Sequence, residues 1–355
     1  MKKIIILILS LFLCTGCLDY HEINDIALVK AIGIDYQNDE YYIILEVLND
    51  NKKDNISSYT ITGHDTSLAE AILNASSKLN KEANFSHTEV MLLSKNIIET
   101  KFQNIIDYFL RSTKFRENLY VLSSLNTPLE DILNYKNDAN LIATNAILGK
   151  MKNNNETNNP SIIKDFERIL KEIVTYGKDT CFTNITLNDD DLIIDGAVAF
   201  HDYKYMEKLS NEEVLIYNLL LNNNNNYILN NTYDNKEISL SVNNGKPSVK
   251  IINNRIEING SFTGTLVNNA PNFDIRLLET IDIINEDFKN ILDNNIFNFI
   301  NHLQSINSDI LGIDNLFYKK NRYKLEGYWQ KLEVNVDTKF NINKKGIIYE
   351  VDNEK

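Results

Sequence analysis

The side chain with the clearest capacity for chemistry is the thiol of Cys17. It follows a stretch that begins with two lysines, continues through the apolar run 4–12 and ends in small residues. A charged start, an apolar core of about 7–15 residues and a small-residue cleavage site are the parts of a secretory signal. The core is too short to cross a bilayer as a helix, which takes about 20 residues. The sequence therefore predicts export and removal of residues 1–16 as a signal peptide.

The residues around Cys17 resemble the bacterial lipobox, in which the cysteine thiol receives a diacylglyceryl group and the cysteine becomes the first mature residue. The lipobox prefers leucine three positions before the cysteine. Here Cys14 occupies that position, with Leu13 one place earlier. Cysteine packs as a small apolar residue, so Cys17 is the predicted lipid attachment site. The alternative is an ordinary secretory signal followed by an unmodified cysteine.

Few other residues are spaced for catalysis or metal binding. The five histidines are scattered, without His-Glu-x-x-His or Cys/His spacing, and no Gly-x-Ser-x-Gly elbow or glycine-rich phosphate loop occurs. The run 189–191 of three aspartates lacks the spaced oxygen ligands of a calcium loop and is interpreted as a solvated turn. Cys181 is interpreted as a core residue. We therefore predict no enzymatic activity, no metal and no cofactor.

Three side chains remain as candidates for binding or for a structural role. We expect His87 to be buried and bonded to the backbone. Arg111 and Arg116 lie five residues apart at the end of a predicted helix. They can bind an anionic group, but salt bridges at the helix end are the favoured interpretation.

The charge of the chain bears on its partners. The formal net charge is −13, and removal of residues 1–16 takes away two lysines and no acid, which leaves −15. An acidic protein is repelled by nucleic acid and by anionic lipid headgroups. We therefore predict no nucleic-acid partner, and membrane association through the lipid on Cys17 rather than through a basic face.

The first half of the chain has an α+β pattern. Two β-rich runs, 26–34 and 41–48, flank a polar turn and predict a hairpin. A third strand follows at 57–62, and Ser67 begins a capping-box pattern at the start of a helix. Strands near 89–93 and 119–125 enclose a helix around 105–110. The stretch 128–177 is helical, with Ser161 as the expected cap of a helix that ends at Gly177.

From residue 182 strands return, and a long helix follows them. Its apolar stripe has helical spacing and its opposite face is acidic, so we expect the helix to pack on the preceding sheet. The stripe consists of Leu277, Ile281, Ile284, Phe288, Ile291, Phe299 and Leu303. An alternating strand, 331–340, closes the pattern. The prediction is a multi-domain α+β protein with mixed or antiparallel sheets: a signal peptide 1–16, an N-terminal region 17–180, in which the helical part near 128–177 can form its own subdomain, and a C-terminal domain 181–355.

Several segments, in order along the chain, resemble the Ger(x)C family, the lipoprotein C subunits of bacterial spore germinant receptors. The opening 17–35 is similar to the family's anchor, turn and strand ending in Gly-Ile-Asp, although Leu18 replaces the common aromatic residue. The pattern weakens at 203–206, where the family's lysine-rich turn is missing. The other similar segments are 84–93, 107–116, 196–200, 209–213, 308–313, 328–329 and 334–337.

This resemblance implies a non-enzymatic subunit of a nutrient germinant receptor required for spore germination. It implies anchoring at the outer face of the cytoplasmic membrane, the inner membrane of the spore, and two integral membrane partners, an A-type and a B-type subunit. It also gives a structural role to the motif residues Asp19, Gly33, Asp35, His87, Arg111 and Arg116. The alternative function is a solute-binding lipoprotein of a transporter, but such proteins have two lobes with parallel sheets. A cell-wall hydrolase would need paired carboxylates or a metal set.

Overall fold

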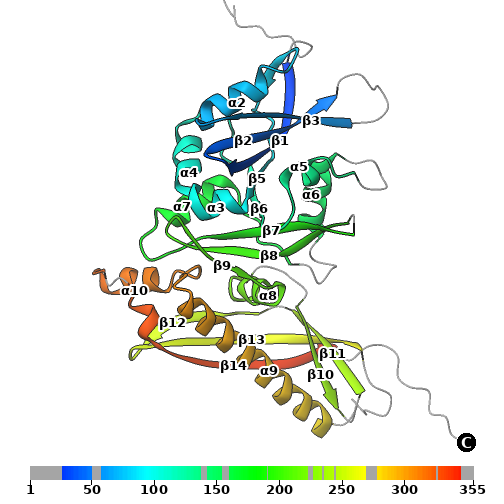
Figure 1. Ribbon diagram of the computed structural model, residues 1–355. Helices are drawn as coiled ribbons and strands as arrows, with labels where there is room; N and C mark the ends of the chain where they lie inside the picture. Colours follow the sequence, from blue (N-terminus) through cyan, green and yellow to red (C-terminus); the bar gives the residue numbers. More distant parts are fainter. Residues whose placement is uncertain are drawn as a thin grey trace, which may run out of the picture.

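The computed structural model describes residues 26–49, 57–136, 142–153, 160–189, 191–222, 227–233, 236–243, 245–268, 278–324 and 327–344. The predicted signal peptide, Cys17 and Asp19 lie outside these residues. Two β-sheets, each with helices packed on it, lie one above the other, and helix α8 lies between them (Figure 1). The fold is α+β, as the sequence predicts.

The larger sheet has, within the described residues, nine strands. Eight of them follow the order β3-β2-β1-β5-β6-β7-β8-β9, and β4 pairs with the start of β1. Its centre, β1-β5-β6-β7, is parallel, and antiparallel strands extend it on both sides. The predicted hairpin is confirmed as β1 and β2. The strands are β1 (Ile26–Gln37), β2 (Glu40–Asn49), β3 (Ser57–Asp65), β4 (Glu82–Asn84), β5 (Val90–Ser94), β6 (Tyr120–Ser124), β7 (Cys181–Asn188), β8 (Asp191–His201) and β9 (Lys204–Leu209).

Helices cover both faces of this sheet, because its central strands are apolar on both sides. One face packs against α2 (Leu68–Ser76), α3 (Lys95–Thr100), α4 (Phe102–Arg111) and α7 (Phe166–Ile173). The other face packs against α5 (Leu129–Leu133) and α6 (Ala143–Lys152). The buried carboxylate of Glu46 in β2 accepts the backbone N–H groups of Ala143 and Thr144 at 2.8 and 3.0 Å. A carboxylate at this end complements the dipole of α6.

The smaller sheet contains β10 (Tyr227–Tyr233), β11 (Lys236–Asn243), β12 (Ser248–Ile252), β13 (Arg255–Asn268) and β14 (Glu333–Lys344). Strand β14 runs parallel to β13 along its length, so the chain must cross over between them. Helix α9 (Leu278–Ser305) makes this crossing, followed by α10 (Ile313–Asn321) and a 3₁₀ turn, Trp329–Lys331. The predicted stripe of α9 is confirmed for its described residues: Ile284, Phe288, Phe299 and Leu303 are at most 1% exposed, Ile281 is buried and Ile291 is partly buried. Leu277 lies outside the described residues.

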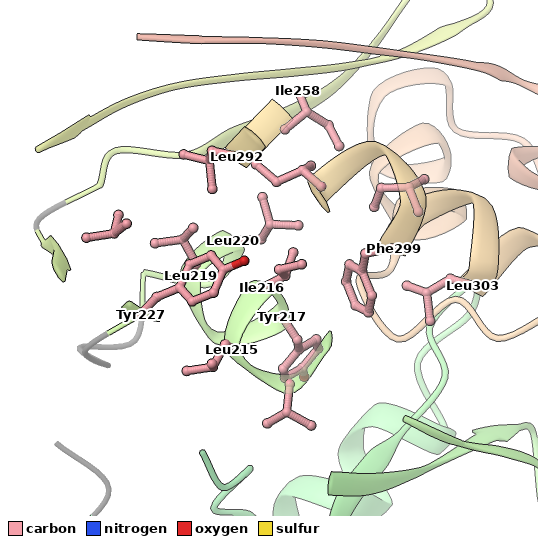
Figure 2. Close-up of a cluster of buried hydrophobic side chains, with 14 of the residues drawn as sticks. Leu215, Ile216, Tyr217, Leu219, Leu220, Tyr227, Ile258, Leu292, Phe299 and Leu303 are labelled. Carbon is pink, nitrogen blue, oxygen red and sulfur yellow. The ribbon is translucent and has the colours of Figure 1, made fainter. Parts of the chain in front are cut away.

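Helix α8 (Asn211–Leu220) joins the two sheets. Every residue from Val214 to Leu220 is buried, as expected of a helix with apolar side chains on nearly all sides. The one polar residue among them, Asn218, donates to the Ser161 carbonyl at 3.0 Å. Ser210 and Glu213 form a capping box that fixes its start. Figure 2 shows its side chains, among them Ile216 and Leu220, in one cluster with residues of β10, β13 and α9.

Strands β7 and β8 face two different cores. Phe182 and Phe200 pack with the N-terminal helices, whereas Cys181 and Ala199 pack with α8 and the C-terminal sheet. The predicted division between residues 180 and 181 falls directly before β7, and β7 pairs with β6, so the larger sheet runs across it. The domain boundaries themselves stay a prediction.

Two predicted helix starts differ in the structure. Helix α2 begins at Leu68, but the Ser67 side chain makes no cap, and the Ser67 N–H donates to Asp65 at 3.0 Å. Ser161 does not cap α7: the N-cap is Asp165, which accepts from the Arg168 N–H at 2.9 Å. The start is later because the Ile162 N–H donates to the hydroxyl of Thr183 in β7, which binds this segment to the sheet.

Candidate functional site

The loop between α9 and α10 is bonded to the ends of β7 and β8, and we call this region the junction site. The Asp309 N–H donates to Asp179 Oδ2 at 2.7 Å, and the Asp179 N–H donates to the Asp309 carbonyl at 2.9 Å. The other Asp179 oxygen accepts the Asp202 N–H at 2.9 Å. The Ser308 hydroxyl donates to the Phe200 carbonyl at 2.5 Å. The bonds made by Ser308 and Asp309 connect residues more than 100 positions apart and fix the C-terminal part against the larger sheet.

Asp309 is the central group of the junction site. Its two carboxylate oxygens accept the N–H groups of Ile313 and Asp314, both at 2.8 Å, at the start of α10. Burial raises the pKa of Asp309 to about 7, and the neighbouring carboxylates of Asp314 and Asp179 act in the same direction. The two backbone hydrogen bonds lower this pKa and only partly offset the burial.

A buried ion pair lies next to this region. Lys164 Nζ donates to Glu172 Oε2 at 2.5 Å, and the side chains are 1% and 5% exposed. Thr180 also donates to Glu172 Oε2, at 2.9 Å, and Cys181 Sγ lies 3.6 Å from Lys164 Nζ. Burial would raise the pKa of Glu172, but the attraction and hydrogen bond of Lys164 outweigh it and lower that pKa. The pair therefore stays charged in the core.

A cavity of about 610 Å³ opens at the junction site. Asp179, His201 and Lys324 are among its lining residues, together with Tyr176 and Trp329. Its polar groups largely bond to one another: His201 lies 3.1 Å from Asp179, and Lys324 lies over the Tyr176 ring at 4.7 Å. Among the described residues, no group of three or more His, Cys, Asp or Glu is arranged to hold a metal ion. The hydrogen bonds of Ser308, Asp309 and Asp179 give this region a structural role in connecting the two sheets.

The raised pKa of Asp309 predicts that stability rises as pH falls. The folded-state pKa of about 7 lies above the ordinary value of 3.8, so the folded protein binds the proton more tightly than the unfolded chain does. Between about pH 7 and pH 4 the free energy of unfolding should increase on acidification by an amount on the order of a few kcal/mol. Urea denaturation between pH 8 and pH 5 measures this. Asp309→Asn should flatten this part of the profile, and an unchanged profile would contradict the assignment.

The structure describes five of the predicted motif residues, and they do not come together in one site. Gly33 lies in β1, and a Cβ there would be 3.0 Å from Leu133 Cδ1, so glycine allows α5 to approach the sheet. Asp35 accepts the Tyr36 N–H at 2.7 Å at the end of the hairpin. Arg111 pairs with Asp107 at 2.9 Å, within one helical turn and exposed to solvent. Arg116 is exposed.

The expectation that His87 is buried is wrong. His87 is exposed in the turn before β5. The neighbouring Thr88 is buried instead, and its hydroxyl donates to the Val29 carbonyl at 3.1 Å. The turn directs consecutive side chains to opposite sides, so the residue that bonds to the backbone is the threonine. Cys181 is buried, as predicted.

Sequence reasoning missed the residues that connect the sheets. Asp309 lies in the segment 308–313, which resembles the family. Nothing in the local sequence pattern indicates that it contacts Asp179, 130 positions away. Lys164 gives no signal either, because a lysine between short apolar runs is normally exposed. These contacts depend on tertiary structure, which local periodicity does not contain.

Comparison with known proteins places the chain in a family. Residues 19–187 match the spore germination protein N-terminal domain, and residues 195–346 match the spore germination B3/GerAC-like C-terminal domain. The chain belongs to the GerAC-like family of spore germination proteins. This confirms the resemblance found in the sequence. Within the described residues, no helix combines the length and the apolar character needed to span a membrane.

Individual relatives agree with this family. The chain is 26% identical to spore germination protein KC of Bacillus subtilis over 157 residues, which cover 40% of this chain and 38% of that protein. It is 22% identical over 388 residues to putative spore germination protein YfkR of Bacillus subtilis, with 98% and 97% covered. The crystal structure of the GerBC protein has the same fold, with a TM-score of 0.53 and 14% identity, covering 88% of this chain and 96% of that one.

Proposed function

We propose that this GerAC-like protein is a lipid-anchored, non-enzymatic subunit of a nutrient germinant receptor. Its anchor is the lipid on Cys17, at the outer face of the cytoplasmic membrane, which is the inner membrane of the spore. It works there with an A-type and a B-type integral membrane subunit. The observation that carries the proposal is that two spore germination family domains match residues 19–187 and 195–346, almost the whole chain.

The geometry of the junction site supports a role through contact. Its carboxylates accept backbone N–H groups, and its basic side chains have partners within the protein. Groups used in this way hold the structure together and are not free to bind or activate a substrate. Tethering to one membrane confines the protein and its partners to the same surface, which raises their effective concentration.

Cys17→Ala should release the protein from the membrane or leave it uncleaved, and germination should weaken. Each buried methylene contributes about 0.8 kcal/mol, so a single acyl chain binds a membrane only marginally. The two chains of a diacylglyceryl group give stable anchoring, which the variant would lose. Membrane fractionation and immunoblotting of the mature form measure this. A variant that remains mature and membrane-bound would contradict the anchor.

The protein lacking its lipid should bind nutrients negligibly by itself and should be recovered with the polytopic subunits after gentle solubilisation of spore membranes. Small-molecule sites normally combine an apolar pocket with a few convergent polar groups. In the cavity at the junction site, His201 is paired with Asp179 and Lys324 with the Tyr176 ring. Titration calorimetry with amino acids and sugars tests the first part. Tight, saturable binding of a nutrient would favour the solute-binding class instead.

A further inference from the structure

Basic side chains gather on and after α10, although the whole chain has a net charge of −13. Between residues 313 and 324 the sequence has four basic side chains, all exposed: Lys319, Lys320, Arg322 and Lys324. The one acid in this segment, Asp314, is buried and accepts the Trp329 N–H at 2.9 Å. The local surface is therefore positive, which the average composition conceals.

A groove of about 500 Å³ lies between α7 and α10. Arg168 and Lys171 reach it from α7, Lys178 from the turn before β7, and Lys319 from α10. Helix α10 lies more than 100 residues after α7 and the turn with Lys178, so the complete basic cluster exists only in the folded protein. Clustered lysine and arginine side chains around a concavity provide charge-assisted donors for an anionic oxygen.

Three carboxylates also line the groove, but two of them are already engaged. Asp165 caps α7 through the Arg168 N–H at 2.9 Å. Glu172 is paired with the buried Lys164, and its other oxygen lies 3.3 Å from Lys178 and 3.9 Å from Arg168. Asp165 keeps its negative charge and Glu167 is exposed, so with Lys164 included five basic side chains meet three carboxylates. The groove therefore keeps an excess of positive charge.

Apolar side chains accompany the basic ones. Leu316 lines the groove and is 39% exposed, and it shares a helix face with Lys319 and Lys320 at spacings of three and four. Tyr323, just after α10, is 54% exposed. Basic side chains next to exposed aliphatic and aromatic ones are typical of surfaces that lie at a lipid headgroup boundary.

We propose that the groove between α7 and α10 binds the anionic headgroups of phospholipids, with Leu316 and Tyr323 at the edge of the acyl region. The inference rests on the proposed membrane anchor, which keeps this surface close to lipid. Phosphate oxygens would accept from Arg168, Lys171, Lys178 and Lys319. The basic face also revises the expectation, drawn from net charge alone, that only the lipid on Cys17 attracts the protein to the membrane. It sets which side of the protein faces the bilayer.

The test uses the mature chain with Cys17→Ser, so that no lipid anchor contributes; all described elements lie after residue 25 and are retained. This protein should co-sediment with vesicles of phosphatidylglycerol and phosphatidylcholine but not with pure phosphatidylcholine. Lys171→Glu combined with Lys319→Glu should weaken binding at least tenfold, since each basic residue near an anionic surface contributes about 1 kcal/mol. High salt should have the same effect.

The matched control reverses two exposed lysines away from the groove, Lys114→Glu and Lys136→Glu, and should bind as the parent does. Equal loss in both variants, or no binding by the parent, overturns the proposal. Inorganic phosphate at the same concentration as the lipid phosphate should not displace the protein from the vesicles. If it does, the groove is a site for free anions and the proposal is wrong. A third result would also overturn it: the parent does not bind vesicles, and the groove variant no longer co-purifies with the polytopic subunits. That result would indicate that the groove contacts a protein. The vesicle experiment does not depend on the anchor, because the protein used in it has no Cys17. The Cys17→Ala experiment tests the anchor separately.

Discussion

Replacing Glu172 by glutamine should lower the free energy of unfolding by about 3–5 kcal/mol. The change leaves Lys164, whose side chain is 1% exposed, without a carboxylate partner in the core. Burial alone would lower the pKa of Lys164, and attraction to Glu172 is among the interactions that outweigh it in the native protein. Without Glu172, the lysine must either stay charged without a partner or lose its proton. Both outcomes cost stability, which urea denaturation measures.

The control for this variant is Glu99→Gln. Glu99 forms an exposed pair with Lys95 at 3.8 Å, so the same chemical change there should cost less than about 1 kcal/mol. A double replacement, Lys164→Met with Glu172→Leu, should recover most of the lost stability because it removes both buried charges together. If Glu172→Gln lowers the free energy of unfolding no more than Glu99→Gln does, the ion pair between Lys164 and Glu172 does not determine stability.

Phe288→Asp should abolish folding of the C-terminal part. Phe288 is fully buried in α9 and stacks on Phe340 of β14, with ring centroids 6.2 Å apart. The variant loses a large apolar side chain, about 3–5 kcal/mol, and buries an unpaired charge as well. Together these approach the total stability of a typical protein, about 5–15 kcal/mol. Soluble yield, circular dichroism and size-exclusion chromatography report the loss.

Phe297→Asp is the matched control on the same helix. Phe297 is 42% exposed, so its replacement should leave the protein folded. A folded, soluble Phe288→Asp variant would mean that the stripe of α9 faces a partner or solvent instead of the sheet.

Features with a strong local period were predictable from the sequence. The stripe of α9 recurs along a helix of 28 residues and specifies one buried face, and the alternating run before Phe340 specifies β14. Helix starts were less predictable. Ser161 has the right residue type for a cap, but the bond from the Ile162 N–H to Thr183 holds the chain against the sheet there. A contact across the fold prevailed over a local preference.

The candidate site was less predictable than the fold because its contacts are long-range. Lys164 and Asp309 are polar residues in the core, and their positions become favourable only when Glu172 and the start of α10 meet them. The basic groove has the same origin: Lys171 and Lys178 lie in or just after α7, and Lys319 comes from α10, far away in the sequence. Net charge averages over the chain and cannot show such a cluster.

The strands that face two cores at once determine how the molecule responds to force. Phe200 and Ala199 are neighbours on β8, yet one packs against the N-terminal helices and the other against α8. A hinge between domains needs a segment that few contacts cross, and here the connecting strands are themselves packed on both faces. Interiors of this density transmit strain rather than absorb it. We therefore expect a force on one sheet to rotate the whole protein as one rigid body.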